Sequence, residues 1–154
     1  MATLRDRLTL GALAGIGAIL TRDVYSFFAK QVGFSKFYVW NIAADLFHKD
    51  KEVYTALGTI IGILADLGMG ALLGVFFVYL LRWTGEANPI IKGAGVGIGS
   101  WLFLFGIMFH TLPHTAQTAP LDAMSNFSAF VGHTIFGLSL GLIGSKLLGV
   151  LRDD

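Results

Sequence analysis

Four long apolar stretches alternate with short polar segments along the chain. They cover residues 8–32, 57–81, 90–112 and 126–151. At about 1.5 Å per helical residue, each is long enough to cross the roughly 30 Å hydrocarbon core of a bilayer. A helix also satisfies its own backbone hydrogen bonds where water is absent. The pattern therefore predicts an all-α, polytopic membrane protein in which residues 1–154 form a single four-helix transmembrane domain.

The first stretch differs from the others because charges interrupt it. Its uninterrupted apolar part, residues 8–20, would span only about 20 Å as a helix, which is too short to cross. The helix must therefore continue through Arg22 and Asp23 into the apolar residues that follow. Arg5 and Arg7 before an apolar run are typical of a signal peptide, but the small residues lie inside the run and not after it. We expect a retained membrane helix.

The composition agrees with lipid as the solvent of this chain. Hydrophobic residues make up 55% of the sequence and charged residues 14%, whereas soluble domains carry about 25% charged residues. The formal net charge of +1 and the lack of a basic patch argue against a nucleic-acid partner, so the expected partner is the lipid bilayer itself. Cysteine is absent, which excludes disulfides, thiolate metal sites and thiol catalysis.

The distribution of Lys and Arg predicts an orientation. With the N-terminus inside, the inner side holds Arg5, Arg7, Arg82, Lys92, Lys146 and Arg152, and the outer side holds Lys30, Lys36, Lys49 and Lys51. Membrane proteins keep most of their loop Lys and Arg in the cytoplasm. We expect both termini to be cytoplasmic.

The segment 34–54, between the first two helices, mixes aromatic and charged residues. Phe37, Trp40, Ala44 and Phe47 follow helical spacing, which predicts an amphipathic helix lying at the outer membrane interface. A simpler interpretation is an aromatic anchor at the membrane edge.

Glycines recur four residues apart within the apolar stretches. The pairs are Gly11/Gly15, Gly58/Gly62, Gly70/Gly74, Gly93/Gly97, Gly95/Gly99 and Gly137/Gly141. Such pairs let helix backbones approach closely in lipid. They predict a tightly packed bundle and self-association through a glycine-rich face, although spacing alone does not say which pairs serve which role.

Four ionisable residues are expected at one depth in the outer half of the bilayer: Arg22, Asp23, Asp66 and His133. Measured along their helices, Arg22 and Asp66 differ in depth by about 2 Å, and His133 lies within about 5 Å of them. Charges in lipid need partners, so Arg22 should face Asp66. Two interpretations of this polar layer remain open. It is a packing ion pair with His133 bonded to a backbone carbonyl, or it is a proton or ion pathway with a cavity opening outward.

The histidines raise the question of a metal site. His110 and His114 are four residues apart, but Pro113 between them predicts that the third helix ends there and that residues 113–125 form an exposed polar loop. His48 and His133 are the other candidates for a metal or haem site. This pattern is too weak to predict a bound metal or a cofactor.

One segment resembles a known group of proteins. The sequence of residues 121–143, with its Ser125-Asn126-Phe127 start and the Gly132-His133 pair, resembles the last helix of small four-helix inner-membrane proteins of bacteria. The resemblance implies a prokaryotic inner-membrane location and carries no known activity.

The sequence holds no nucleotide-binding, serine-hydrolase or zinc-protease motif, so we predict no catalytic residues and favour a protein that is not an enzyme. A structural or accessory membrane protein, or one that forms oligomers, is the leading hypothesis. A small transporter or channel using the polar layer, and a histidine-ligated metal or haem protein, are the alternatives.

Overall fold

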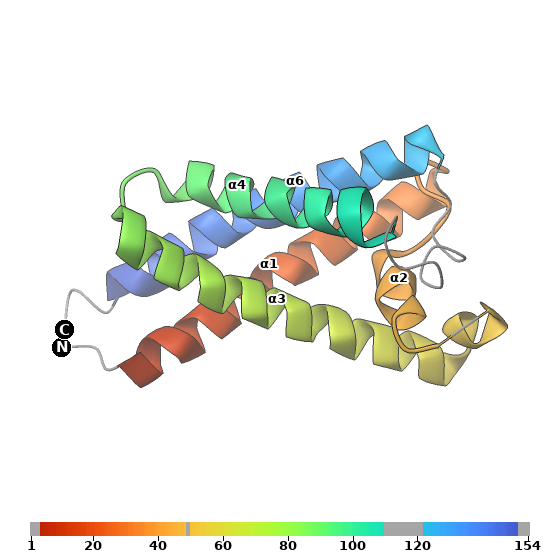
Figure 1. Ribbon diagram of the computed structural model, residues 1–154, viewed down its shortest axis with the longest axis horizontal. Coiled ribbons are helices and arrows are strands. Elements are labelled where there is room, and N and C mark those ends of the chain that lie inside the picture. The colour runs from red at the N-terminus through yellow and green to blue at the C-terminus, as the bar shows by residue number, and fades with distance from the viewer. Residues whose placement is uncertain (1–3, 49, 110–121, 151–154) are drawn as a thin grey trace.

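The computed structural model describes residues 4–48, 50–109 and 122–150, and within them every regular element is helical (Figure 1). The elements are α1 (Leu4–Gln31), α2 (Val39–Asp45), the 3₁₀ turn η1 (Asp50–Tyr54), α3 (Ala56–Thr84), α4 (Pro89–Trp101), the π-helix η2 (Leu102–Met108) and α6 (Ala123–Val150). Among these residues, four helical spans are long and apolar enough to cross a membrane. They correspond to the four predicted stretches, and α1 continues through Arg22 and Asp23 as expected.

The start of α6 corrects one prediction. The helix begins at Ala123, three residues before the expected start at 126. The side chain of Asp122 accepts a hydrogen bond of 3.1 Å from the backbone N–H of Ser125, which caps the helix there. The last three residues of the predicted 113–125 loop are therefore helical, and Ser125 is buried, whereas Ala123 and Met124 are exposed as expected. Pro113 lies outside the described residues.

The turn between α3 and α4 is set by its local chemistry. Gly85 follows α3 with a φ of 83°, a left-handed conformation that glycine adopts without strain. Lys92 then donates hydrogen bonds from Nζ to the carbonyl oxygens of Thr84 (3.1 Å) and Gly85 (2.6 Å). These bonds satisfy the end of α3 and hold α4 antiparallel to it.

Two of the three helix interfaces are built on glycine. At the α1–α3 interface, a methyl group added to Gly15 would overlap the carbonyl oxygen of Gly70, and one added to Gly74 would overlap that of Gly11. At the α4–α6 interface, Gly97 approaches the His133 carbonyl in the same way. The third interface, between α1 and α6, is bridged by side-chain hydrogen bonds, whereas α3 and α4 contact each other little beyond their shared turn.

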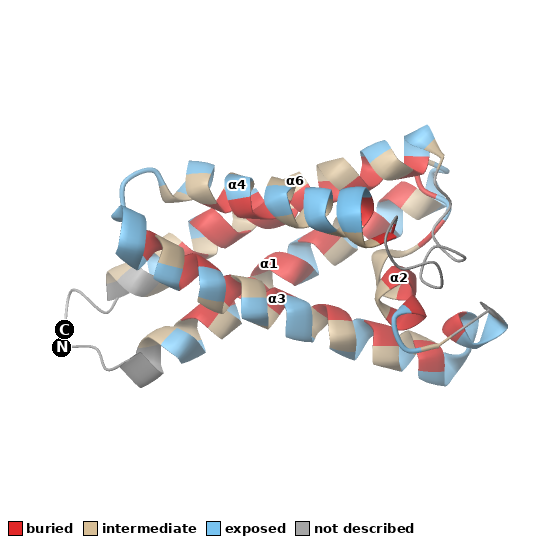
Figure 2. Ribbon diagram, viewed as in Figure 1, coloured by how far each residue is buried: buried red, intermediate tan, exposed pale blue. Residues whose placement is uncertain are grey.

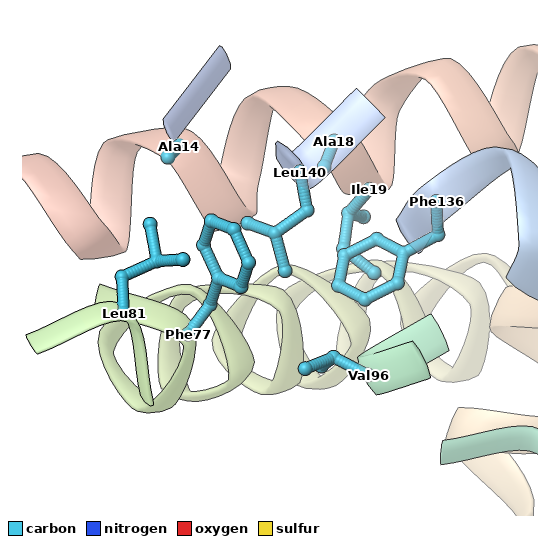
Figure 3. Packing of buried hydrophobic residues seen from close by; sticks show 8 residues of the cluster. All are labelled: Ala14, Ala18, Ile19, Phe77, Leu81, Val96, Phe136 and Leu140. Carbon is cyan, nitrogen blue, oxygen red and sulfur yellow. The ribbon is translucent and has the colours of Figure 1, made fainter. Parts of the chain in front are cut away.

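Apolar side chains fill the centre of the bundle near the end where α1 begins (Figure 3). This inner cluster consists of Ala14, Ala18, Ile19, Phe77, Leu81, Val96, Phe136 and Leu140. A second, outer cluster lies toward the other end and consists of Phe37, Ile42, Phe105, Phe109 and Ala129. Buried residues follow the faces where helices meet, and the outward faces are exposed (Figure 2).

The segment between α1 and α3 only partly matches its prediction. A helix is present, but α2 has seven residues and packs against α3, where the Gly62 backbone approaches the Trp40 carbonyl. Its buried side includes Ile42 and Ala44, whereas Phe47 lies beyond the helix and is exposed. In Figure 1, α2 lies between α3 and the end of the α4–η2 segment. The expected long surface helix is therefore a short helix set into the bundle.

Candidate functional site

Arg22 lies midway along α1 and faces two carboxylates. Its Nη2 forms an ion pair with Asp66 of α3, and it also lies 3.0 Å from Oδ1 of Asp23. The Nε of Arg22 donates to the same Asp23 oxygen over 3.3 Å. Arg22 and Asp66 are 4% and 5% exposed, respectively. The ion pair predicted from the depth of the two residues is thus present, and Asp23 joins it as a second acceptor.

His133 lies in the same region, and only one of its two ring nitrogens has a hydrogen-bond partner among the described residues. Its Nδ1 is 2.8 Å from the carbonyl oxygen of Ala129, one turn earlier in α6. A carbonyl oxygen can only accept, so Nδ1 carries the ring proton and Nε2 is left with a lone pair. Nε2 is buried and has no hydrogen-bond partner among the described residues. Phe105 packs edge-on against the ring, with 5.8 Å between centroids.

The polar layer is enclosed along the bundle axis. On α1, the inner-cluster residues Ala14 to Ile19 precede Arg22, and on α6 the inner-cluster Phe136 follows His133 by one turn. The outer cluster contributes Ala129 on the other side of His133 and Phe105 against its ring. Apolar packing therefore covers the layer toward the end where α1 begins. Toward the other end, the outer cluster is accompanied by buried polar side chains, namely Ser26, Asn41, Asp45 and Ser128.

A small cavity of about 60 Å³ adjoins the layer. Arg22, Asp66 and His133 line it on one side, and the remaining lining residues are almost all apolar. It lies beside a larger groove of about 650 Å³ between α3 and α4. The residues that line both are Leu46, Met69, Leu73, Ser100, Leu104 and Met108. The cavity and the groove therefore adjoin each other across these side chains.

The glycine pairs now divide into two kinds. Five of them pack against backbone inside the bundle, including Gly58/Gly62 against the segment that precedes α3. A methyl group on Gly95 or Gly99 would meet nothing within 4 Å, and both glycines line the groove. Gly95/Gly99 is thus the predicted pair left on an outer face, and self-association through it remains a prediction.

The described residues do not form the metal site considered for the histidines. Within residues 4–48, 50–109 and 122–150, no group of three or more His, Cys, Asp or Glu side chains is arranged to hold a metal ion. His48 lies 3.7 Å from Glu52, on the exposed segment before α3. The other two candidates, His110 and His114, lie outside the described residues.

Sequence reasoning missed the wall of the cavity that η2 supplies. Leu104, Phe105 and Met108 line the cavity from this π-helical stretch, and their positions depend on its wider turn. Short π-helices are rare and occur often at functional sites. The run LFLFGIM has no periodic polar residue that would reveal the change of helix type, so the π-helix could not be predicted from the sequence.

Comparison with known protein families, with curated proteins and with solved structures finds no match to this chain. The likeness of residues 121–143 to small bacterial inner-membrane proteins therefore stays a prediction, and the functional argument rests on the geometry of the site.

Proposed function

We propose that this chain is an accessory protein of the bacterial inner membrane that crosses the bilayer four times, with both termini in the cytoplasm. It acts by associating laterally with a component of the bilayer, and neither conducts ions nor catalyses a reaction. The observation that carries this proposal is the site itself: a polar layer that buried side chains cover toward both ends of the bundle and that adjoins a groove on its side.

Membrane insertion is supported by the outer surface. Large apolar side chains that are more than half exposed occur on all four long helical spans, among them Leu13, Phe28, Leu72, Ile91 and Phe127. A soluble monomer rarely exposes so extensive an apolar surface, because water penalises it. In lipid the same surface carries no penalty.

The orientation is supported by the placement of charges. The start of α1 and the end of α6 lie at the same end of the bundle (Figure 1), which is also the end of the α3–α4 turn. By the bounds of their helices, Arg5, Arg7, Arg82, Lys92 and Lys146 lie near this end. Lys30, Lys36 and Lys51 lie toward the other end, and the cytoplasmic side of a membrane protein carries the excess of Lys and Arg. In intact cells, a tag fused to either terminus of the protein should therefore be inaccessible to a reagent added outside. An N-terminal tag that is labelled from outside would contradict this orientation.

The absence of conduction is tested in proteoliposomes that contain a pH-sensitive dye. We expect proton flux equal to that of protein-free liposomes, with no change in the Asp66→Asn variant. A flux that exceeds the control and disappears in Asp66→Asn would overturn the proposal in favour of the transporter hypothesis.

A further inference from the structure

The cavity beside the polar layer presents a buried acceptor that nothing in the bundle satisfies. His133 is 2% exposed, and its Nε2 lone pair has no partner among the described residues. A buried acceptor without a donor is unfavourable, and such groups in native proteins call for an explanation. The cavity that His133 lines adjoins the groove between α3 and α4, and six side chains line both.

We propose that the cavity and groove bind a neutral lipid from the bilayer, whose hydroxyl group donates a hydrogen bond to Nε2 of His133. The apolar chain of this lipid lies in the groove, along Gly95 and Gly99. The inference rests on the proposed function, because it names the bilayer component with which the protein associates.

The charges around the cavity select an uncharged headgroup. Arg22 is already paired with Asp66 and Asp23, so one guanidinium faces two carboxyl groups and a further anion would be repelled. A charged head of either sign would also have to lose its water among apolar walls, which is strongly unfavourable. A hydroxyl supplies the donor that Nε2 requires and carries no charge.

The dimensions agree with a small head and a long chain. The cavity, at about 60 Å³, has room for several water-sized groups, so a hydroxyl head fits it. The groove follows α4 from Leu104 back to Lys92, about 18 Å at 1.5 Å per residue. The head therefore lies nearer α2 and the chain points toward the α3–α4 turn, the direction of a lipid in the leaflet on the α2 side.

A helix from a second copy would fit the glycines but not the acceptor. Backbone N–H groups within a membrane helix are already bonded to their own carbonyls, so a docked helix brings no free backbone donor to Nε2 of His133. A water molecule can donate to Nε2 but does not cover the apolar groove. A hydroxyl attached to an apolar chain satisfies the acceptor and the groove together.

The test measures binding of matched amphiphiles to the purified full-length protein by native mass spectrometry. The probes are dodecan-1-ol, its methyl ether, which has no donor, and dodecanoate, which is anionic. We expect the alcohol to bind about tenfold more tightly than the ether, the effect of one buried hydrogen bond. Dodecanoate should bind no better than the ether.

Three variants locate the effect. His133→Phe keeps an aromatic ring and removes the acceptor, so the alcohol and the ether should bind equally. Gly99→Leu fills the groove where a side chain has open space, and should weaken both probes at least tenfold. Gly149→Leu, which also has open space but lies near the end of α6, away from the cavity and the groove, should bind as the native protein does.

Each remaining outcome overturns the inference in its own way. Equal binding of alcohol and ether to the native protein removes the hydroxyl contact but leaves lateral association intact. Tightest binding of dodecanoate contradicts the charge argument. A dimer that Gly99→Leu converts to monomer identifies the groove as a self-association surface. Failure of every probe to bind removes the lipid site, while the flux measurement still decides the proposed function.

A second measurement covers the case in which His133→Phe does not fold. In native protein with ¹⁵N-labelled histidine, the alcohol should shift the resonance of the unprotonated nitrogen of His133, and the ether should leave it unchanged. Identical spectra with both probes would contradict the contact.

Discussion

Two glycine pairs with the same spacing lie on the two sides of α4, and only one of them packs against another helix. Gly93/Gly97 lies against α6, where the backbones approach so closely that a single added methyl group would overlap a carbonyl oxygen. Gly95/Gly99, only two residues farther along, faces open space beside the groove. The comparison shows that glycine spacing identifies a surface fit for close approach, but the helix face decides whether the protein uses it internally.

The largest expected effect is a loss of stability when one methyl group is added to the face against α6, but not when it is added to the open face. Gly97→Ala should lower the free energy of unfolding by about 3 kcal/mol, because the helices must move apart or distort. Gly99→Ala should be neutral, or stabilise slightly because alanine favours helix. Reversible unfolding in mixed micelles measures both variants side by side. Equal losses from the two would mean that the groove is filled by close packing.

A second comparison concerns the satisfied and the unsatisfied parts of the polar layer. Asp66→Asn removes one carboxylate from Arg22 but leaves Asp23, so we expect a loss of about 2 kcal/mol, less than the roughly 3–5 kcal/mol of a fully uncompensated charge. The measurement is the same unfolding equilibrium. No loss of stability would indicate that water, not protein, compensates Arg22.

Asp23 also determines which substitutions can restore the stability that is lost when the ion pair is broken. Replacing only the predicted pair, Arg22→Met with Asp66→Leu, leaves Asp23 without its cation. The double variant should therefore recover little stability, and addition of Asp23→Asn should recover most of it. Full recovery by the double variant would show that the Arg22–Asp23 contact contributes nothing.

The smallest effect is expected at the exposed end of α6. The hydrogen bond from the Ser125 N–H is the main cause that lowers the pKa of Asp122 below its ordinary value of 3.8, and Lys36, at 3.3 Å, adds to it. Because the folded state has the lower pKa, this stabilisation is present above pH 4 and is lost as the pH falls through the lowered value. Asp122→Asn should make unfolding less dependent on pH in this acid range, and an unchanged acid profile would contradict the assignment.

Much of the bundle could be predicted because hydropathy and helix geometry act locally. The depth of Arg22 and Asp66 follows from counting residues, and their need for partners in lipid follows from their charge. The direction of Gly95 and Gly99 could not be predicted, because it depends on how α4 is rotated against α6. The π-helical turn that brings Phe105 to the cavity, and the burial of α2 on Gly62, likewise depend on tertiary contacts.

The central claim is that the polar layer is reached from the lipid side and not from water. The chain has no cysteine, so a single nitroxide label attached at Ser100→Cys, which lines both cavity and groove, reports on this site alone. In liposomes we predict frequent collisions with dissolved oxygen and few with a water-soluble nickel complex. A label at Ala87→Cys, an exposed position in the turn between α3 and α4, serves as the water-facing control. Nickel collisions at position 100 as frequent as at position 87 would contradict the claim.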